Sequence, residues 1–505
     1  MGKVYIVGSG PGDPRLITLK ALDAIRKADC IVYDRLAGQS LLSEAPPCAE
    51  CIYAGKRSGA HSMSQADINR LLVEKACAGL CVVRLKGGDP LLFGRGAEEA
   101  DALAEAGIDF EIIPGVTAAL GAAAYAGIPL TDRRECSSVT FVTGREGEGG
   151  SPGVNWKALA QTRGTIVVYM GRSELADVSR ELATAGLDAQ TPAVVIENAT
   201  LPGERVVAGT LGDIAAKADA AGLEPPCITI IGAVAGKYPS LSWFERLPLF
   251  GKSVCLTRPD GVQDALARAL EDLGAEVIRF PAIEIVPSPP ERLAEGLSSL
   301  PDADWVVFTS GQGVETFFDA LTREGRDARA LAGKRVAAVG PATAEALLAT
   351  GIKADLVPAT FTGAALLDEL LSASENGEEF LLWRAAAARE ELADGLRRAG
   401  RIVVEVVAYE AVRPASVDAA LRERLISAPP SAILFSSAST VRNFVDLVGT
   451  AEAKAISETS KLISIGPVTS AALRELGFPV HTEAAVHTSE GLLAATVDII
   501  GARSG

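Results

Sequence analysis

The chain has 505 residues, of which 48% are hydrophobic and 22% are charged, and its formal net charge at pH 7 is −16. This acidic balance argues against a general nucleic-acid binder, which normally carries a basic surface, and the hydrophobic content argues against a disordered chain. The length suffices for about three or four compact units of ~150 residues.

The chain begins with a strand-like run that ends in glycines. Residues 4–7 predict a buried strand, and Gly8, Gly10 and Gly12 crowd the turn that follows. A dinucleotide-binding fingerprint would require glycine where Asp13 stands, and a carboxylate there would repel a pyrophosphate. Asp13 followed by proline is instead typical of a helix start. We therefore expect the glycines to allow close backbone approach to a ligand other than a phosphate.

Two stretches bear on partners and location. Residues 52–95 hold seven Lys and Arg against three Asp and Glu, which a solvated face explains on charge alone and which would also serve a polyanionic substrate. The uncharged run 112–131 approaches transmembrane length, but its small residues and two prolines favour a buried helix flanked by turns. No signal-peptide pattern precedes the first strand, so we expect a cytoplasmic protein without membrane or nucleic-acid partners.

The eight cysteines favour reduced thiols in a large chain of this kind. Two spacings, Cys48 to Cys51 and Cys77 to Cys81, are compatible with zinc ligands. The second pair spans a predicted helix end and the next strand, where side chains are not expected to converge. We favour buried or incidental cysteines over a structural zinc site and assign no metal.

Strand and helix patterns alternate along the chain, which predicts α/β layers with ligands at the carboxyl ends of strands. We expect an N-terminal half over residues 1–245, with subdomains of about 1–135 and 136–245, and a separate C-terminal half over residues 252–505.

The C-terminal half contains an internal repeat. VVFTSGQGVETFF (306–318) resembles AILFSSASTVRNFV (432–445), and AAVGPATAEALLATGI (337–352) resembles LISIGPVTSAALRELGF (462–478). Nearly equal offsets predict two similar α/β subdomains with Ser/Thr-rich turns at helix N-termini. Helix capping explains any single hydroxyl, whereas their recurrence at matched strand ends also fits an anion-binding cleft.

The string RLKGGDPLLFGRG (84–96) is the most specific in the chain. Five further strings accompany it in order: VGSGPGDPRLIT (7–18), VYDRLAG (32–38), AGKRSGAHSMSQADIN (54–69), IPGVTAALGAAAYAGIPLT (113–131) and VVYMG (167–171). Over about residues 2–245 the chain thus resembles the uroporphyrinogen-III C-methyltransferases of the tetrapyrrole methylase family.

This resemblance implies a cleft that binds S-adenosyl-L-methionine in a folded pose, which is what the opening glycines would hold. Small residues and backbone groups suit a sulfonium cofactor, which needs close packing and hydrogen bonds rather than a phosphate cradle. The cofactor contacts that the resemblance implies are Pro11, Gly87, Gly88, Asp89, Leu92, Thr117, Ala118, Met170 and Ala199.

The resemblance also implies in-line transfer of two methyl groups to pyrrole carbons of uroporphyrinogen III, giving precorrin-2. Asp34 matches the family's proposed proton acceptor and Lys56 its proposed proton donor. The alternatives are turn capping for Asp34 and anchoring of a substrate carboxylate for Lys56. Arg57, Arg84 and Arg95 are candidates for pairing with acetate and propionate groups, and some of them are alternatively structural.

The chain departs from the family pattern after the Gly-Ile-Pro at 127–129. Asp132-Arg133-Arg134 stands where the family commonly has His-Arg-Asp, so a histidine and any role assigned to it are absent. Ala199 stands at a position where glycine is common.

The C-terminal half resembles uroporphyrinogen-III synthase over about residues 252–500. The strings that carry this resemblance are LTRP (256–259), FTSGQGV (308–314), VGPATA (339–344), LLWRAAAAREEL (381–392), VVAYEAV (406–412), FSSAS (435–439) and IGPVTS (465–470). The family fold implies two α/β domains joined by two strands: subdomain one from 252–284 plus 412–505, and subdomain two from 287–409.

Synthases of this family close linear hydroxymethylbilane with inversion of ring D, through loss of hydroxide and a spiro intermediate. Tyr409 is expected on a connecting strand facing the cleft, where it is the candidate for assisting the leaving hydroxyl. A core tyrosine with a satisfied hydroxyl is the alternative. The candidate carboxylate-binding groups are Thr309, Ser310, Thr343, Ser436, Ser437 and Thr469.

We therefore predict an α/β protein in which a two-domain tetrapyrrole methylase fold precedes a two-domain uroporphyrinogen-III synthase fold. Hydroxymethylbilane and uroporphyrinogen III are the expected substrates, and the methyltransferase family implies a homodimer. Methylation of a later corrin intermediate and a non-catalytic tetrapyrrole-binding or sensing protein are the alternatives. Sirohaem and cobalamin pathways fit equally, since both begin at precorrin-2.

Overall fold

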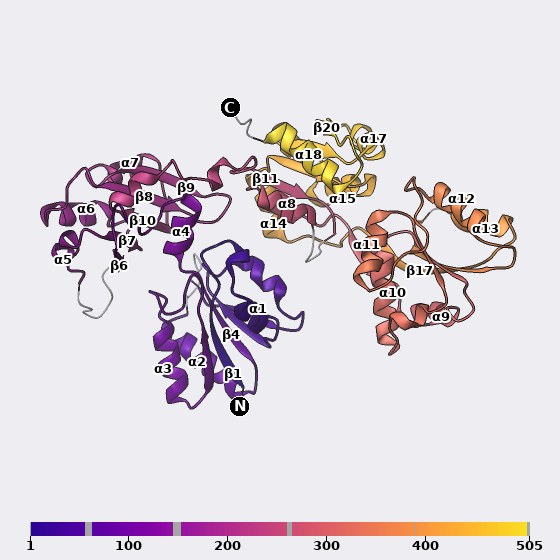
Figure 1. The fold of residues 1–505 in the computed structure, drawn as a ribbon, viewed down its shortest axis with the longest axis horizontal. Coiled ribbons are helices and arrows are strands. Elements are labelled where there is room, and N and C mark those ends of the chain that lie inside the picture. The colour runs from indigo at the N-terminus through magenta and orange to yellow at the C-terminus, as the bar shows by residue number, and fades with distance from the viewer. Residues whose placement is uncertain (1, 56–62, 145–152, 260–264, 389, 502–505) are drawn as a thin grey trace.

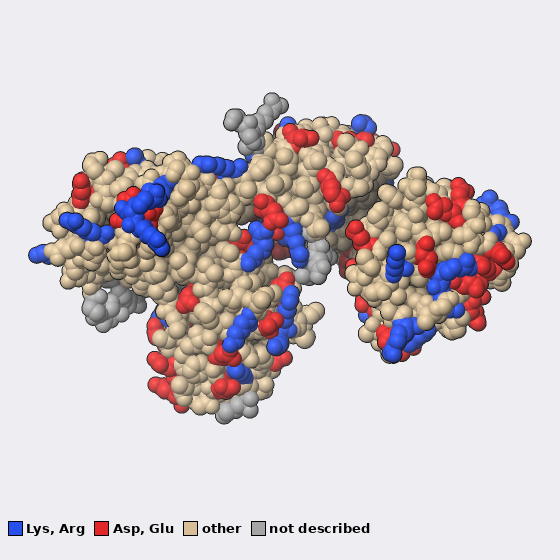
Figure 2. All heavy atoms as spheres, in the orientation of Figure 1, with Lys and Arg blue, Asp and Glu red and all other residues tan. Residues whose placement is uncertain are grey.

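The computed structural model describes residues 2–55, 63–144, 153–259, 265–388 and 390–501. Within them the chain forms four sheets of five strands each, with helices packed against them (Figure 1). Lys and Arg side chains are interspersed with Asp and Glu over the visible face (Figure 2), so the net negative charge is not gathered into one patch there. The expected contacts Lys56 and Arg57 lie outside the described residues.

The first sheet is wholly parallel, with strand order β3-β2-β4-β1-β5. Its strands are β1 (Lys3–Gly8), β2 (Cys30–Tyr33), β3 (Glu50–Tyr53), β4 (Val82–Lys86) and β5 (Asp109–Ile113). Its helices are η1 (Pro14–Leu16), α1 (Leu19–Ile25), η2 (Gln39–Glu44), α2 (Gln65–Cys77) and α3 (Gly96–Glu105). Parallel strands end at one edge of a sheet, so the loops that follow these five strands meet there.

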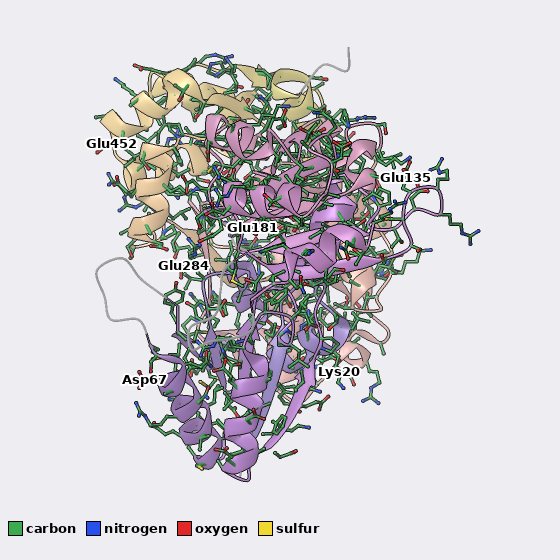
Figure 3. The ribbon with its side chains drawn as sticks, turned by 90° about the vertical axis from the view of Figure 1, so that its left-hand side faces the viewer. Lys20, Asp67, Glu135, Glu181, Glu284 and Glu452 are labelled. Atoms are coloured by element: carbon green, nitrogen blue, oxygen red, sulfur yellow. The ribbon has the colours of Figure 1, made fainter. Side chains whose placement is uncertain are left out.

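Both faces of this sheet are buried, as is usual for parallel strands. Val82 of β4 packs with Leu72 of α2, while its neighbour Val83 packs with Ile25 of α1 on the opposite face, because adjacent strand residues point to opposite sides. Helix α2 starts at a capping box in which Ser64 accepts the backbone N–H of Asp67 and the Asp67 carboxylate accepts that of Ser64; Figure 3 marks Asp67.

The second sheet is mixed, with strand order β6-β7-β10-β8-β9. Its strands are β6 (Val139–Thr143), β7 (Thr165–Tyr169), β8 (Pro192–Glu197), β9 (Arg205–Thr210) and β10 (Cys227–Ile231). Its helices are α4 (Ala118–Ala126), α5 (Trp156–Gln161), α6 (Leu175–Thr184), α7 (Ile214–Ala220), η3 (Ala233–Lys237) and η4 (Phe244–Arg246). Helix α4 directly follows the β5 loop of the first sheet and buries Ala119 and Ala122 against the second, so it joins the two.

The uncharged run at 112–131 thus forms the end of β5, helix α4 and the turns around it. Among the residues described, no helix is both long enough and apolar enough to cross a membrane.

The third sheet is parallel and has strand order β12-β11-β18-β19-β20. Its strands are β11 (Ser253–Leu256), β12 (Glu276–Arg279), β18 (Ala432–Phe435), β19 (Lys461–Ser464) and β20 (Thr482–Glu483). Its helices are α8 (Ala265–Asp272), α14 (Ala419–Ser427), α15 (Ala438–Val448), α16 (Thr450–Thr459), α17 (Pro467–Glu475) and α18 (Ser489–Ile500).

The fourth sheet has strand order β13-β17-β16-β14-β15, and β13 pairs antiparallel with β17. Its strands are β13 (Glu284–Pro287), β14 (Trp305–Phe308), β15 (Arg335–Ala338), β16 (Glu379–Ala385) and β17 (Ile402–Val412). Its helices are α9 (Pro290–Ser298), α10 (Gly311–Arg323), η5 (Ala328–Leu331), α11 (Pro341–Ala349), α12 (Gly363–Ala373) and α13 (Glu391–Arg398).

The repeated strings form matching units in these last two sheets. Strand β14 leads into α10 and pairs in parallel with β15, while β18 leads into α15 and pairs in parallel with β19. The third sheet draws on two separated ranges, and the fourth lies between them in the chain. The four-unit division with its expected boundaries remains our proposal.

A short aromatic segment joins the two halves. The Phe244 ring lies 4.8 Å from the Tyr125 ring of α4 and 5.2 Å from the Phe250 ring, measured between centroids. Leu249 is buried in the core beside the third sheet, where it packs with residues such as Val254. The halves also meet at an ion pair between Arg15 and Asp272.

Candidate functional site

Three loops contact one another at the carboxyl edge of the first sheet. The N–H of Gly88 donates to the carbonyl of Gly10 over 2.7 Å, and the N–H of Gly10 donates to the carbonyl of Gly88 over 3.3 Å. The N–H of Gly115, after β5, donates to the Asp89 carboxylate over 3.2 Å. The loops after β1, β4 and β5 are therefore fixed to each other by backbone-centred hydrogen bonds.

Glycine is required at this junction because backbone packs directly on backbone. A Cβ at Gly8 would lie 2.5 Å from the Gly88 carbonyl oxygen, and one at Gly115 would lie 2.2 Å from the same atom. Gly88 itself has a φ of +65°, which favours glycine. Asp13 is confirmed as the N-cap of η1, since its carboxylate accepts the N–H of Arg15. The glycines at this junction therefore allow the three loops to pack closely against one another.

The second sheet contributes to the same junction through Tyr169, the last residue of β7. Its hydroxyl lies 2.6 Å from Oγ1 of Thr117 and accepts the N–H of Ala119 over 3.0 Å. Its ring lies 5.0 Å from the Phe93 ring, on the loop after β4. Burial raises the pKa of Tyr169, so the phenol stays protonated and can donate to Thr117. Met170 follows with a φ of 49° and a half-exposed side chain.

A further connection runs through the loop after β8. The N–H of Asp13 donates to Oγ1 of Thr200 over 2.9 Å, and a Cβ at Gly12 would lie 3.0 Å from the carbonyl oxygen of Ala199. Pro11 packs against Gly121 of α4, where a Cβ would lie 2.5 Å from the proline ring. Leu92 and Ala118 pack against the hydrophobic cluster that contains Ala199 and Tyr169. The structure thus brings the expected cofactor residues of both sheets to one junction.

Asp34 lies directly after β2 at the same edge, and its side chain is 30% exposed. Its carboxylate accepts Nη2 of Arg84 over 3.2 Å and the N–H of Leu36 over 3.2 Å. The second contact is the turn capping that the sequence left open, and the first ties Asp34 to a cation. Arg84 is buried and also contacts Glu99, so it already has two carboxylate partners within the protein. Its pairing with substrate carboxylates stays a prediction.

Arg95 stands at the start of α3, with a φ of 59° and an exposed side chain that pairs with Glu98 over 2.7 Å. The pairing of Arg95 with a substrate carboxylate stays a prediction.

The segment that departs from the family pattern folds back on itself. The Asp132 carboxylate accepts the backbone N–H of Arg134 over 2.9 Å and its Nη2 over 2.8 Å. These hydrogen bonds hold the pKa of Asp132 well below its usual range, with the charge of Lys237 contributing. Asp132 is thus an ionised, locally satisfied carboxylate.

In the C-terminal half, Tyr409 lies on β17 between β13 and β16 and is buried. Its hydroxyl lies 2.7 Å from Oγ of Ser310, which also accepts the N–H of Gly313 as the N-cap of α10. A satisfied hydroxyl fits the core-tyrosine alternative as well as a catalytic role, so the role of Tyr409 stays a prediction.

The other hydroxyl candidates occupy matching places in the repeat. Ser437 caps α15 as Ser310 caps α10, accepting the N–H of Thr440 over 3.2 Å. Thr343 and Thr469 are buried in the first turns of α11 and α17. Thr309 and Ser436 are half-buried just before the two capping serines. Capping is therefore confirmed for the two serines, while carboxylate binding remains a prediction.

Several residues of the junction were not singled out from the sequence. They are Gln65, Lys86, Glu99, Tyr169 and Thr200. The charged ending of the buried-strand pattern VVRLK was a signal for Lys86, because buried cations need partners, but nothing in the spacing identified Glu99 as that partner.

The eight cysteines are all free thiols. Cys48, Cys51 and Cys77 are exposed, and Cys81 is half-buried. The described part of the chain contains no group of three or more His, Cys, Asp or Glu side chains placed to hold a metal ion.

Both halves are α/β units with loops at the carboxyl ends of parallel strands, which is where proteins of this class bind their ligands. Residues 3–215 match the sequence model of the tetrapyrrole (corrin/porphyrin) methylases, and residues 264–494 match that of uroporphyrinogen-III synthase HemD. The porphyrin biosynthesis protein HemD of Ruminiclostridium josui is 37% identical over 445 residues, which cover 88% of each chain. The chain therefore belongs to the tetrapyrrole methylases in its N-terminal half and to the uroporphyrinogen-III synthases in its C-terminal half.

Relatives of the N-terminal half alone are also similar. An S-adenosyl-L-methionine-dependent uroporphyrinogen III methyltransferase of Methanosarcina barkeri is 50% identical over 234 residues, covering 46% of this chain and 92% of that protein. The solved uroporphyrin-III C-methyltransferase of Thermus thermophilus, complexed with S-adenyl homocysteine, is 38% identical and has a TM-score of 0.41; the match covers 47% of this chain and 100% of that one.

Proposed function

We propose that the chain catalyses two consecutive steps. Its C-terminal half closes hydroxymethylbilane to uroporphyrinogen III with inversion of ring D, and its N-terminal half methylates that product twice to precorrin-2. The chain is an enzyme that joins a uroporphyrinogen-III C-methyltransferase to a uroporphyrinogen-III synthase, and S-adenosyl-L-methionine is its methyl donor. The observation that supports the methylation step best is the bridge between Gly10 and Gly88, since it unites the two glycine strings of the family at one sheet edge.

The junction residues fit this cofactor. The glycines let the loops after β1, β4 and β5 pack backbone on backbone at Gly8, Gly88 and Gly115, so the edge of the proposed cofactor cleft is built from closely packed loops. The backbone of Gly87 and Gly88, Thr117, Ala118 and Met170 would hold it, together with Pro11, Asp89, Leu92 and Ala199. When bound, the cofactor supplies an electrophilic methyl group.

The chain's own part in methylation is to orient the substrate carbon and accept a proton after the attack. We assign the role of proton acceptor to Asp34. Its side chain is partly exposed at the sheet edge, and its carboxylate is paired with the cation of Arg84. Arg95 is an exposed cation suited to a substrate carboxylate. Lys56 and Arg57 keep their roles as sequence-based proposals.

For ring closure we assign to Tyr409 the assistance of the departing hydroxyl. Ser310, which contacts it, also belongs to the repeated set of hydroxyls at helix N-termini, where backbone N–H groups favour anions. The substrate's carboxylates would bind at these places in both repeats.

Joining consecutive enzymes raises the local concentration of the shared intermediate. We further propose a cytoplasmic homodimer that associates through the methylase half. The synthase half of this chain favours uroporphyrinogen III over a later corrin as the methylated substrate.

A coupled assay tests the proposal. The full chain is incubated with hydroxymethylbilane and S-adenosyl-L-methionine, and products are followed by absorbance and mass. We expect a product with two added methyl groups, and uroporphyrinogen III should accumulate with Asp34→Ala. Formation of only the type I isomer, the product of spontaneous closure, would contradict the synthase assignment. Unmethylated uroporphyrinogen III from the unaltered chain would contradict the methylase assignment.

A further inference from the structure

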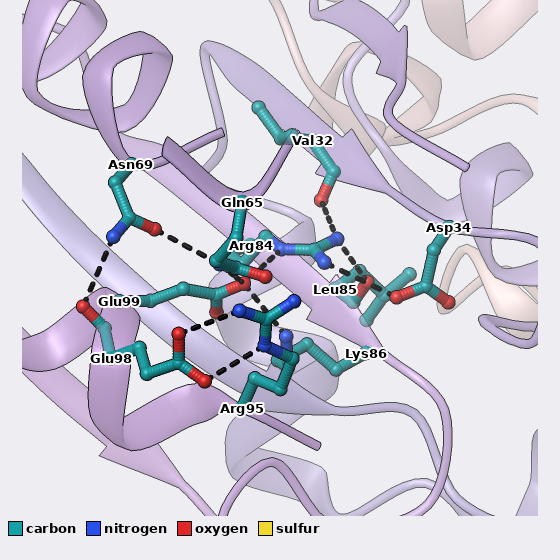
Figure 4. Close-up of polar contacts among 10 residues, drawn as sticks. All are labelled: Val32, Asp34, Gln65, Asn69, Arg84, Leu85, Lys86, Arg95, Glu98 and Glu99. Carbon is teal, nitrogen blue, oxygen red and sulfur yellow. Dashed lines mark hydrogen bonds and ion pairs between the residues drawn. The ribbon is translucent and has the colours of Figure 1, made fainter. Parts of the chain in front are cut away.

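Four charged side chains form a continuous array at the carboxyl end of β4 (Figure 4). The exposed fractions are 0% for Glu99, 3% for Arg84 and 4% for Lys86, while Asp34 is 30% exposed. Burial of charges is costly unless they are paired and hydrogen-bonded, so this arrangement has to be specific.

The strand pattern places both cations on one side. Arg84 and Lys86 alternate with Leu85, so they share the face of β4 on which Val82 packs against α2 and α3. The register pairs Val32 of β2 with Arg84, so Asp34, two residues further on, projects from the same face. On this face of the sheet, the apolar residues that pack against α2 and α3 are followed, at the carboxyl ends of β2 and β4, by the charged side chains of Asp34, Arg84 and Lys86.

Glu99, in the first turn of α3, closes the array from the helix side. Its Oε1 accepts Nε of Arg84 over 3.0 Å and Nζ of Lys86 over 2.7 Å. Nε2 of Gln65, at the start of α2, donates to the same oxygen over 3.1 Å. The second oxygen of Glu99 is buried without a hydrogen-bond partner among the described residues. One carboxylate oxygen therefore fixes two cations and two helices.

Every nitrogen of the Arg84 guanidinium is engaged. Nε bonds to Glu99, Nη2 bonds to Asp34 over 3.2 Å, and Nη1 lies 3.4 Å and 3.3 Å from the carbonyl oxygens of Val32 and Leu85. A guanidinium held on all sides is a rigid fork, and its outward end points at the proposed proton acceptor.

Lys86 is the second cation that contacts Glu99. Burial lowers the pKa of Lys86, and the nearby charge of Arg84 lowers it further, while Glu99 acts in the opposite direction. Both cations thus share one buried carboxylate oxygen, and Asp34 is the second carboxylate that Arg84 contacts.

We propose that Arg84 is a positioning residue for Asp34 in methyl transfer, that Glu99 locks Arg84 in place, and that Arg84 is not a ligand of the substrate carboxylates. The proposal rests on the assignment of Asp34 as proton acceptor under the proposed function. It differs from substrate binding in where it acts: misplacing Asp34 lowers kcat, whereas losing a substrate contact raises KM.

A double-mutant cycle in the full chain tests this. Arg84→Lys keeps the cation but loses the fork that reaches both carboxylates. We expect its kcat for methylation of uroporphyrinogen III to fall about 10- to 100-fold, with the substrate KM within about twofold. In an Asp34→Asn background, measured by single turnover, the same change should cost less than about threefold, because Arg84 acts through Asp34.

Arg70→Lys is the matched control, since Arg70 is exposed on α2 and pairs with Asp67. Binding of S-adenosyl homocysteine, measured by calorimetry, reports whether the methylase half of each variant is folded. Glu99→Gln is the second variant if Arg84→Lys fails to fold, because it keeps the shape and an acceptor oxygen. Its expected loss of kcat is smaller and should likewise nearly vanish in the Asp34→Asn background.

A raised KM with unchanged kcat, or losses that simply multiply in the cycle, would overturn the proposal. Full activity of Asp34→Asn would instead remove the role assigned to Asp34. If the unaltered chain does not methylate uroporphyrinogen III at all, the proposed function fails, and that outcome is distinct from a multiplicative cycle in an active enzyme.

Discussion

The hydroxyl of Tyr409 lies 2.7 Å from Oγ of Ser310, 99 residues earlier in the chain. The contact ties strand β17 of the fourth sheet to the N-terminus of helix α10. Ser310 keeps its capping bond to Gly313 without Tyr409, so the phenol can be removed with little harm to the helix.

Tyr409→Phe should therefore slow ring closure while leaving methylation of supplied uroporphyrinogen III unchanged. We expect the enzymatic closure rate to fall about 100- to 10,000-fold, the range for a positioned proton donor, and the type I isomer to increase as spontaneous closure takes over. Chromatography of the oxidised porphyrin isomers measures the ratio. Ser310→Ala is the comparison. It removes the helix cap, which lowers the free energy of unfolding by about 1 kcal/mol, and it keeps the Tyr409 phenol. A normal closure rate in Tyr409→Phe would make Tyr409 a core tyrosine only.

Gly115→Ala should disrupt the loop junction. The new Cβ would lie 2.2 Å from the Gly88 carbonyl oxygen, so the β4 and β5 loops must separate. We expect a loss of about 1–3 kcal/mol in the free energy of unfolding and no measurable binding of S-adenosyl homocysteine in calorimetry. Gly203→Ala is the matched control, because no atom lies within 4 Å of its added Cβ. Equal binding by both variants would contradict the assigned cofactor site.

Tyr169→Phe should weaken cofactor binding from the side of the second sheet. It removes the partner of the Thr117 hydroxyl and of the Ala119 N–H, at about 1–3 kcal/mol for a buried group left without a partner. We expect the dissociation constant for S-adenosyl homocysteine to rise about tenfold, since 1.4 kcal/mol corresponds to that factor. Tyr238→Phe removes a similar phenol that bonds to Glu245 instead, and it should bind normally. A larger defect in Tyr238→Phe than in Tyr169→Phe would refute the prediction.

Glu204→Gln should change how stability depends on pH. Glu204 is buried and accepts the N–H of Thr200, and burial raises its pKa from 4.5 to about 7. The native carboxyl thus holds its proton more tightly than the unfolded one, so its contribution is favourable below pH 4.5 and is lost as pH rises through 7.

The variant should therefore be more stable than the unaltered chain at pH 8, by up to about 3 kcal/mol, and similar to it at pH 5. Thermal unfolding of the full chain measures this, with the methylase transition recognised by its shift on adding S-adenosyl homocysteine. A variant that is less stable than the unaltered chain at pH 8 would show that the ionised carboxylate is favourable in its buried place.

The sequence strings predicted the two halves and the loops of the methylase site because their residues are local. Glycines at strand ends permit tight turns, and the proline after Asp13 fixes the backbone at a helix start, so both signals act within a few positions and can be read from their spacing. The repeat in the C-terminal half was equally readable, since each copy is one strand and one helix.

The partners of Arg84 could not be predicted from the sequence. In the sequence Arg84 was one of several cations in a basic stretch, with a substrate carboxylate as its candidate partner and a structural role as the alternative. In the structure, helix α3 folds back over β4 and places Glu99 against it. Burial and pairing of this kind depend on how elements pack in three dimensions, and spacing along the chain carries no record of that packing.

The sequence by itself determined the family of each half, the alternation of strands and helices and the position of the glycine loops, because turn chemistry and strand periodicity act over short distances. Only the tertiary structure decided that the Tyr169 hydroxyl contacts Thr117, that Tyr409 contacts Ser310, and that the Arg84 guanidinium pairs with Glu99 and Asp34. These contacts join residues 15 to 99 positions apart, and their energies depend on burial that exists only once the sheets and helices have packed.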